Sequence, residues 1–309
     1  MHTIRPLASD EHSAWKELVA GSPQAGLFQS LEWNQALCET SGRAESFLPI
    51  VCEHKGCLLG GIVLRYVERR GRKRADLPPF GYNGPVLAKS LGYSERCHTI
   101  PSYRVLEGLL VHVRETMACA VIHNQPELWD MRAFKYQDWK LETSYTHILH
   151  RRALDSIWTG VVPKLQEQIA AELERMSLDL EPTEVRIREF CAQVQANRRY
   201  KKLMGNRIRH LLEAGMGHLV TILGKDGREL ATSLLLLSRE NLTIYVLKTV
   251  HRAMEGTVPL ALPLLLWRAS QRLLDGVERL ELGVAENVDQ AQLLDRLGCE
   301  LLPWFSAKT

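Results

Sequence analysis

The chain has 309 residues, of which 45% are hydrophobic and 24% are charged, and its formal net charge is +3. A chain of this length and apolar content is too long for one small core, so we expect two domains. The low net charge excludes a strongly basic, histone-like protein but is compatible with an anionic ligand.

The sequence also predicts a compartment. No segment approaches the roughly 20 uninterrupted apolar residues that a membrane span needs. Residues 1–15 lack the basic start and apolar run of a secretory signal. The seven cysteines are odd in number and include no CxxC pair, so we expect neither a disulfide framework nor a zinc site. We therefore expect a cytoplasmic protein with no membrane span and no metal.

In chain order, the first half predicts a hairpin followed by alternating helices and strands. Residues 47–68 form two apolar runs joined by a turn at Lys55-Gly56, because glycine allows the positive φ that a tight hairpin needs. The later elements are an apolar helix at 102–118, a strand at 119–124, and a short helix with a closing strand within 131–150.

A mostly helical segment, 154–203, separates the two halves. Pro182 interrupts its pattern, and Thr183 is placed to cap the helix that follows. We interpret this segment as the opening helices of the second domain.

The second half repeats the order of the first. Its hairpin turns at Asp226-Gly227, and the other elements are a strand at 241–250, a helix at 257–276, a strand at 278–287, and a short helix with a closing strand within 290–308. Such repetition indicates a duplication. We predict a mixed α/β (α+β) fold with domains at 1–150 and 151–309, each a twisted mixed sheet flanked by helices.

The segment 77–89, LPPFGYNGPVLAK, combines three prolines, two glycines and two aromatic residues. Proline fixes φ, and glycine and asparagine allow positive φ, so Tyr82 and Asn83 are predicted to be held rigidly at a cleft. The alternative is a tight connection between strands, in which Phe80 and Tyr82 cap the core.

Two basic clusters are candidates for phosphate binding. Arg72 and Lys73 belong to a run of cations around Gly71, predicted to be a hairpin tip. Arg199 and Lys202 belong to a predicted helix, within NRRYKKLMGNRIRH. The alternative for each cluster is a solvated surface, which is the commoner role of such charged runs.

Four segments carry a family resemblance: 21–37 (GSPQAGLFQSLEWNQAL), 77–87, 144–150 (SYTHILH) and 217–237. With them the chain resembles the Fem-type aminoacyltransferases and their relatives, which are built from two domains of the GNAT acyltransferase fold. The resemblance implies an acyl transfer to an amine, without a tightly bound cofactor. It places segment 77–87 beside the acceptor groove, the first domain on the acceptor side and the second on the donor side. It also implies that the C-terminal strand completes the first domain's sheet.

The donor is predicted from the junction before the helix at 257–276. GNAT enzymes bind the coenzyme A pyrophosphate there with a [QR]xxGx[GA] pattern, at backbone N–H groups of a helix N-terminus. Arg252 and Gly256 are one residue too far apart for this pattern, and Val258 replaces its second small residue. Asp295 stands where Fem-type proteins tend to carry a lysine. We therefore favour an aminoacyl-tRNA or another activated donor over acyl-CoA, with Lys248, Arg252, Gly256, Arg199 and Lys202 as donor contacts.

The catalytic candidates follow from the chemistry of amide formation. Attack by an amine needs a base for its proton, and no Ser-His-Asp or Cys-His arrangement is visible. Glu281 and Glu286, near the end of the strand at 278–287, are the candidate bases, although polar residues there are often merely exposed. Strand alternation places Glu281 and Leu282 on opposite faces.

Three functions are therefore considered. The first is an N-acyltransferase that moves an aminoacyl or acyl group from charged tRNA, or another activated donor, to an amine of a small-molecule or cell-wall-type acceptor. The second is an acyl-CoA-dependent N-acetyltransferase. The third is a non-catalytic module that binds a ligand or RNA.

Overall fold

The structure, a computed structural model, comprises two compact units. Unit 1 contains Met1–Ser144 and Pro303–Thr309, and unit 2 contains Tyr145–Leu302. The structure describes residues 2–40, 44–76, 78, 80–91, 100–152, 163–194, 198–251, 258–285 and 288–309.

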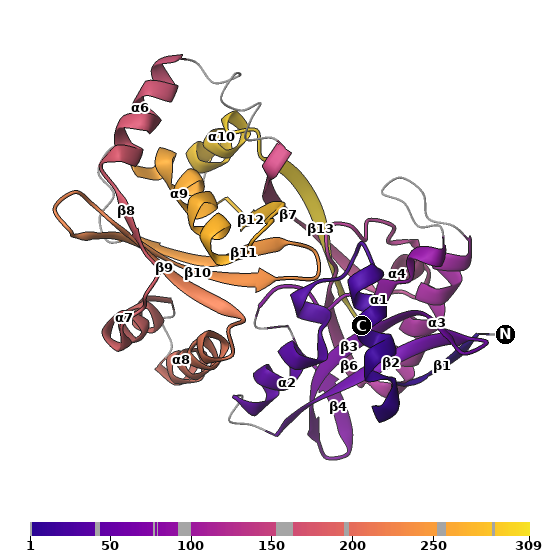
Figure 1. The fold of residues 1–309 in the computed structure, drawn as a ribbon. Helices are drawn as coiled ribbons and strands as arrows, with labels where there is room; N and C mark the ends of the chain where they lie inside the picture. The colour runs from indigo at the N-terminus through magenta and orange to yellow at the C-terminus, as the bar shows by residue number, and fades with distance from the viewer. Residues whose placement is uncertain are drawn as a thin grey trace. The chain divides into compact units, whose positions relative to one another are not determined.

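Unit 1 is a mixed sheet flanked by helices (Figure 1). Its elements are β1 (Thr3–Pro6), a 3₁₀ turn at Ser9–Glu11, α1 (His12–Gly21), a 3₁₀ turn at Leu27–Gln29, α2 (Leu31–Glu39), β2 (Glu45–His54), β3 (Cys57–Arg69), β4 (Arg72–Ala75), β5 (Val86–Leu87), a 3₁₀ turn at Lys89–Leu91, α3 (Ile100–Thr116), β6 (Cys119–His123), α4 (Arg132–Tyr136), the start of β7 (Lys140–His150) and the end of β13 (Glu300–Lys308).

The strands of unit 1 lie in the order β1-β2-β3-β4-β6-β13. All neighbours are antiparallel except β4 and β6, which are parallel. The hairpin between β2 and β3 turns at Lys55 and Gly56, which both have positive φ, as predicted. The tip between β3 and β4 uses Arg70 and Gly71 in the same way, so the predicted basic hairpin tip is confirmed.

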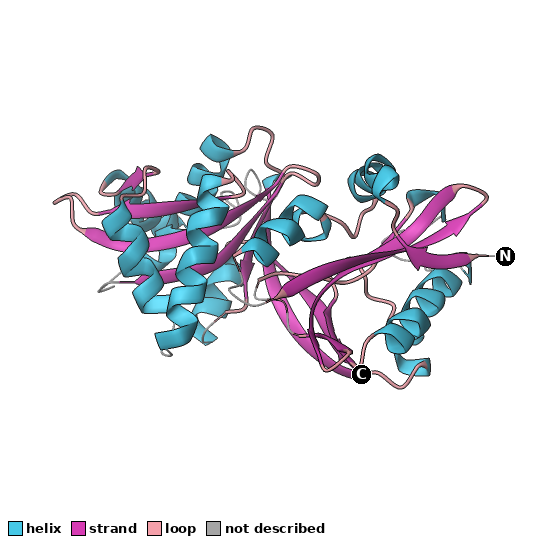
Figure 2. Ribbon diagram, turned by 90° about the horizontal axis from the view of Figure 1, so that it is seen from below, coloured by secondary structure: helices cyan, strands magenta, loops and turns pink. Residues whose placement is uncertain are grey.

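Strand alternation in β2 and β3 gives unit 1 apolar side chains on both faces of its sheet. Ile50 and Ile62 belong to the core that includes α3, whereas Val51 and Val63 pack in a second cluster with Trp15 of α1. Both faces are therefore covered, which explains why these strands are apolar almost throughout. In Figure 2 the strands of each unit lie against helices.

Unit 2 repeats this plan. Its elements are α6 (Pro163–Glu174), β8 (Ser177–Asp179), α7 (Glu184–Val194), α8 (Arg198–Glu213), β9 (Gly217–Leu223), β10 (Glu229–Ser238), β11 (Thr243–His251), α9 (Val258–Leu273), β12 (Arg279–Gly283) and α10 (Val288–Arg296), with the end of β7 and the start of β13.

The strands of unit 2 lie in the order β7-β12-β11-β10-β9-β8, and only β11 and β12 are parallel among these described pairs. Helices α6, α9 and α10 cover one face of the sheet, and α7 and α8 lie on the other (Figure 1). In chain order each unit shows the predicted hairpin, strand, helix, strand and helix. Each sheet is then completed by the strand that follows the other unit's last helix: β7 pairs with β12, and β13 pairs with β6.

The segment between the halves differs in part from the prediction. The Thr183 hydroxyl accepts a hydrogen bond from the Arg186 N–H, so the predicted cap forms. The short strand β8, however, lies where helix was expected, and it pairs with β9 at the sheet edge. Three residues are too few to establish a period-2 pattern against the surrounding helical one.

Among the described residues, none of the helices has the length and apolar content to cross a membrane.

Candidate functional site

The candidate site lies where β11 and β12 of unit 2 separate. The two parallel strands pair at three positions, and the last of these joins Tyr245 to Glu281. Beyond this pair β11 continues to His251, whereas β12 ends at Gly283. The β11 edge that faces β12 is therefore left without a described strand partner beyond Tyr245. Backbone N–H and C=O groups along such an edge need another partner, which a ligand can supply.

Local irregularities explain the separation. The pairing of β12 with β7 shifts between Glu281 and Gly283. Gly283 has a φ of 76°, a backbone conformation that residues with a side chain rarely adopt. The glycine therefore lets the chain turn away from β11 at this point. On β11, Leu247 has no residue opposite it on β10, which is the mark of a β-bulge.

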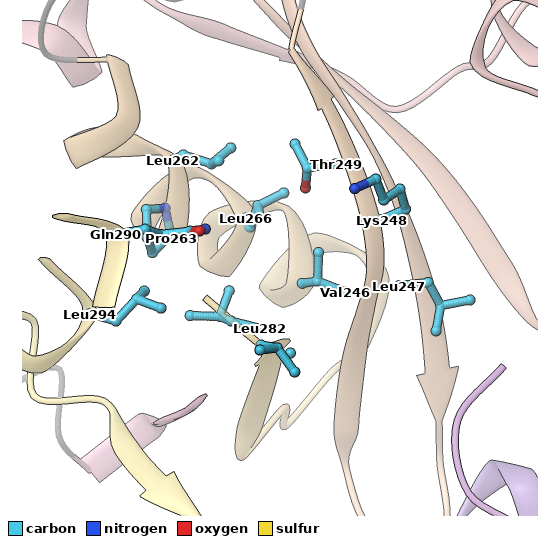
Figure 3. A pocket seen from close by; sticks show the side chains of 12 residues that line it. Val246, Leu247, Lys248, Thr249, Leu262, Pro263, Leu266, Leu282, Gln290 and Leu294 are labelled. Atoms are coloured by element: carbon cyan, nitrogen blue, oxygen red, sulfur yellow. The ribbon is translucent and has the colours of Figure 1, made fainter. Parts of the chain in front are cut away.

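A cavity of about 280 Å³ opens at this separation (Figure 3). Four elements form its walls: β11, the second and third turns of α9, the end of β12 and α10. The lining residues are Val246, Leu247, Lys248, Thr249, Leu262, Pro263, Leu266, Leu282, Gly283, Val284, Gln290 and Leu294.

The cavity is apolar at its floor and open at its mouth. Leu266 and Leu294 are almost fully buried and belong to the core of unit 2, whereas Val284 is 61% exposed. Figure 3 shows Val246 and the ammonium end of Lys248 on the cavity side of β11, with Leu247 pointing away. The cavity therefore combines an apolar floor with polar groups on its β11 side.

Glu281 lies on the other face of β12, as the alternation predicted. Leu280 is in the core below α9, and Leu282 lines the cavity, whereas the Glu281 carboxylate accepts a hydrogen bond from the Thr146 hydroxyl at 3.2 Å. Only 9% of Glu281 is exposed. A nearly buried carboxylate beside a strand separation is a candidate for proton transfer.

The structure brings only part of the predicted donor set to this cavity. Lys248 lines it directly. Arg252, Gly256 and Glu286 lie outside the described residues. The predicted basic helix is confirmed as α8, but the side chains of Arg199 and Lys202 also lie outside the described part of the chain.

The predicted acceptor residues Arg72 and Lys73 belong to unit 1. They lie at the hairpin tip between β3 and β4. Arg72 is exposed, and in the strand register it stands opposite Arg69 across the turn. The Lys73 ammonium lies 5.0 Å from the centre of the Tyr66 ring, a cation–π arrangement. Their role in binding an acceptor stays a prediction.

The aromatic segment of 77–89 packs tightly within unit 1. Tyr82 is 6% exposed. Its ring packs edge-on against Phe28 and Trp304, with distances between ring centroids of 5.9 and 5.8 Å. The Asn83 side chain accepts a hydrogen bond from the His123 N–H at 2.7 Å and donates one to the Val121 carbonyl at 3.0 Å. An acceptor role for Tyr82 and Asn83 stays a prediction, whereas these contacts explain why the segment is rigid.

The same segment occupies, in unit 1, the place that the cavity has in unit 2. The parallel pairing of β4 and β6 ends at Ala75 and Ala120. Three residues further along β6, the His123 carbonyl accepts hydrogen bonds from the backbone N–H groups of Asn83 and Gly84, at 3.0 and 2.9 Å. In unit 2 the residues just beyond the last pair, Leu282–Val284, line the cavity instead. Unit 1 thus fills its own strand separation.

Glycine is required for this close approach. A Cβ atom on Gly84 would lie 2.7 Å from Oδ1 and 2.8 Å from Cα of Asn124. Both distances are shorter than van der Waals contact allows, so position 84 tolerates no side chain without movement of Asn124.

The sequence did not single out most residues that form the cavity. Four leucines and Gln290 belong to elements whose helical or strand spacing indicates only a buried core face. The glycine at the end of β12 was the available signal, because an isolated glycine in a strand can mark a bulge or bend. The missed lining residues are Val246, Leu247, Thr249, Leu262, Pro263, Leu266, Leu282, Gly283, Val284, Gln290 and Leu294.

Comparisons with known proteins define the fold. No family model and no curated protein matches the sequence. The crystal structure of FemX has a TM-score of 0.65 and 11% identity, covering 98% of this chain and 96% of its own. A tandem GNAT protein from the clavulanic acid biosynthesis pathway, solved without AcCoA, has a TM-score of 0.60 and 14% identity, covering 100% and 98%. A conserved protein of unknown function from Bacteroides thetaiotaomicron has a TM-score of 0.53 and 10% identity, covering 100% and 99%.

The chain therefore has the fold of Fem-type and tandem GNAT structures, as the sequence resemblance implied. Each unit is a twisted mixed sheet with flanking helices, so the predicted fold class is confirmed.

The Gly84→Ala variant tests the filled separation in unit 1. The new methyl group would clash with Asn124, so we expect the free energy of unfolding to fall by about 1 to 3 kcal/mol, as for overpacked sites. Urea denaturation measures this change. Gly21→Ala is the matched control, because a Cβ there meets nothing within 4 Å. Equal stability of the two variants would contradict the contact.

The pH dependence of stability tests the burial of His123. Burial lowers the pKa of His123 below its ordinary value of 6.5, although a hydrogen bond with the Gly81 backbone raises it in part. The unfolded chain therefore takes up a proton as the pH falls below about 6.5, before the folded chain does. We expect the contribution of neutral His123 to the free energy of unfolding to be fully present above this pH. It should be lost as the pH falls through the pKa that His123 has in the folded chain, which is lower.

Urea denaturation of the wild type and the His123→Gln variant at pH 7.5 and 5.5 measures the effect. The variant should lose less stability between the two pH values than the wild type. An equal loss in both proteins would show that His123 is not the titrating group.

Proposed function

We propose that the protein is an N-acyltransferase, which moves an acyl group from an activated donor in the unit 2 cavity to an amine. The observation that carries this proposal is the separation of β11 and β12 with a cavity at the point where they part. This geometry lets a donor lie between two strands, with its reactive carbonyl next to backbone groups of β11 that have no described strand partner on that side. Enzymes of acyl transfer use such fixed N–H groups to stabilise the oxygen charge that develops during attack.

The shape of the cavity favours a thioester donor with a narrow arm, such as acyl-CoA or an acyl carrier protein. A cavity of about 280 Å³ with leucines of α9 and α10 on one side and β11 on the other fits an extended arm, whose amide groups can bond backbone groups of β11 beyond Tyr245. Lys248 is a proposed donor contact, because its ammonium end lies on the cavity side (Figure 3). Arg252 and Gly256, predicted to meet the donor's phosphates, precede α9.

Aminoacyl-tRNA is the second candidate donor. It is favoured by α8, which forms one continuous helix through the basic cluster that includes Arg199 and Lys202. An ester-linked aminoacyl group could enter the same cavity while the helix meets phosphates of the RNA. The chemistry at the carbonyl is the same for both donors.

The reaction needs three events at the strand separation. A neutral amine attacks the donor carbonyl, and Glu281 takes a proton from the amine, directly or through a water. A backbone N–H near the bulge at Leu247 stabilises the oxyanion. The bond to the sulfur or oxygen of the donor then breaks, the leaving group takes up a proton, and an amide remains. The acceptor is an amine of a small molecule or a cell-wall-type precursor, and Tyr82, Asn83, Arg72 and Lys73 stay its predicted contacts in unit 1.

The Glu281→Gln variant tests the proposed base. Glutamine keeps the size of the side chain and the acceptor oxygen for Thr146 but takes up no proton, so kcat should fall by at least about 100-fold. The assay follows radiolabel from acyl-CoA, or from charged tRNA with and without RNase, into an acid-stable product with a panel of amines. Glu278→Gln is the matched control, because Glu278 is exposed and sits in a surface pair with Arg151.

The possible results separate the alternatives. Transfer of radiolabel from acyl-CoA into the acid-stable product, unaffected by RNase, supports the thioester donor. Transfer that RNase abolishes supports charged tRNA. Binding of a donor without any transfer would favour a non-catalytic module. Full activity of Glu281→Gln would remove Glu281 from the mechanism.

A further inference from the structure

We propose that His2 and His54 form a binding site for a divalent transition-metal ion such as Zn²⁺, which ties β1 to β2 at the edge of the unit 1 sheet. The site goes beyond the proposed function, since it uses none of the residues placed in acyl transfer.

Strand pairing brings the two histidines together. Thr3 stands opposite Glu53 in the antiparallel register of β1 and β2. One residue earlier in β1 and one later in β2, His2 therefore stands opposite His54. Side chains at opposite positions of an antiparallel pair project from the same face of the sheet. No sequence motif marks this pair, because the two residues are far apart in the chain.

The spacing of the two rings fits a shared ion. Their centres are 5.4 Å apart, and the ring planes are inclined by 33°. With a metal–nitrogen bond of about 2.0–2.1 Å and a ring nitrogen about 1.1 Å from the ring centre, two imidazoles on one tetrahedral ion have centres about 5.2 Å apart. The backbone of the two strands thus already holds the rings at the distance that such an ion requires.

Cys52 orients the His2 ring. Its sulfur lies 3.7 Å from Nδ1 of His2, and it stands two residues before His54, on the same face of β2. A histidine that binds a metal through Nε2 carries its proton on Nδ1, and another group usually accepts a hydrogen bond from it. Cys52 is fully buried with Ile50 and Ile62 in the core of unit 1. Its sulfur can therefore hold the ring from below, while the ion binds at the surface.

The exposure and chemistry of the pair define the class of ion. His2 is exposed and His54 is half-buried, so an ion can reach both rings from water. Among the residues that the structure describes, no third His, Cys, Asp or Glu completes a metal-binding group with them, so water molecules complete the coordination. Imidazoles favour Zn²⁺, Ni²⁺ or Cu²⁺, whereas Mg²⁺ and Ca²⁺ prefer oxygen ligands.

An ion shared by the two rings would stabilise the first strand. β1 has only four residues, Thr3–Pro6, and it ends the strand order of the sheet, with β2 as its described neighbour. A short edge strand is held by few backbone hydrogen bonds and opens easily. A bond from each strand to one ion opposes this opening.

Isothermal titration of the full chain, without an affinity tag, tests the site with ZnCl₂, NiCl₂ and MgCl₂ as probes. We expect Zn²⁺ and Ni²⁺ to bind and Mg²⁺ not to bind. His2→Ala and His54→Ala each leave one imidazole and should each abolish the binding of one Zn²⁺ per chain. His12→Ala is the matched control, because His12 is an exposed histidine at the start of α1, and it should leave this binding unchanged.

Two variants of Cys52 test the orientation of the His2 ring. Cys52→Ala removes the acceptor for the Nδ1 proton and should weaken Zn²⁺ binding about tenfold, as loss of such an outer partner does. Cys52→Ser supplies an acceptor again and should recover most of the affinity. Unfolding curves show whether each variant is folded. Wild-type affinity in folded Cys52→Ala would remove Cys52 from the site.

Hydrogen exchange with and without Zn²⁺ shows where the ion lies. The amides of 3–5 and 51–54 should exchange more slowly with Zn²⁺ in the wild type but not in His54→Ala. Absence of Zn²⁺ binding in the wild type, or binding that survives in both His2→Ala and His54→Ala, would overturn the proposal. Neither result bears on acyl transfer, which the Glu281→Gln variant tests separately.

Discussion

The separation of two parallel strands is the constraint on which the rest of the structure depends. Where β11 leaves β12 after Tyr245, and where β4 leaves β6 after Ala75, one strand edge loses its neighbour. Buried backbone N–H and C=O groups must find other partners, because each one left unpaired is costly. The two units meet this requirement in different ways: a segment of the chain lies at the separation in unit 1, and a cavity lies there in unit 2.

Unit 1 supplies its own partner. The N–H groups of Asn83 and Gly84 and the Asn83 side chain bond the edge of β6, and the ring of Tyr82 closes the segment against Trp304 of β13. Proline and glycine give this segment its rigid course, and the glycine at 84 lets it approach Asn124. Unit 2 has no such segment among its described residues. A cavity lies at its strand separation instead, and in the proposed function a donor provides there what Asn83 provides in unit 1.

Local signals predicted much of the fold. The glycine turns at Lys55-Gly56 and Asp226-Gly227 fixed the two hairpins, and helical spacing identified α3 and α9. The cavity could not be predicted, because leucines on α9, β12 and α10 form one wall only after long-range folding, and each alone has the pattern of a core residue. The segment at 77–89 was correctly expected to be rigid. Its partner, the His123 backbone, carries no mark in the sequence because any residue offers the same groups.

Hydrogen exchange with and without a bound thioester, such as an acyl-CoA, tests the central claim most directly. If the donor lies at the strand separation of unit 2, the amides of 246–250 and 282–285 should exchange more slowly in its presence, because the donor covers or bonds them. The amides of 81–84 and 121–123 should not change, since unit 1 already fills its own separation. Slower exchange confined to the unit 1 residues, with 246–250 and 282–285 unaffected, would contradict the account.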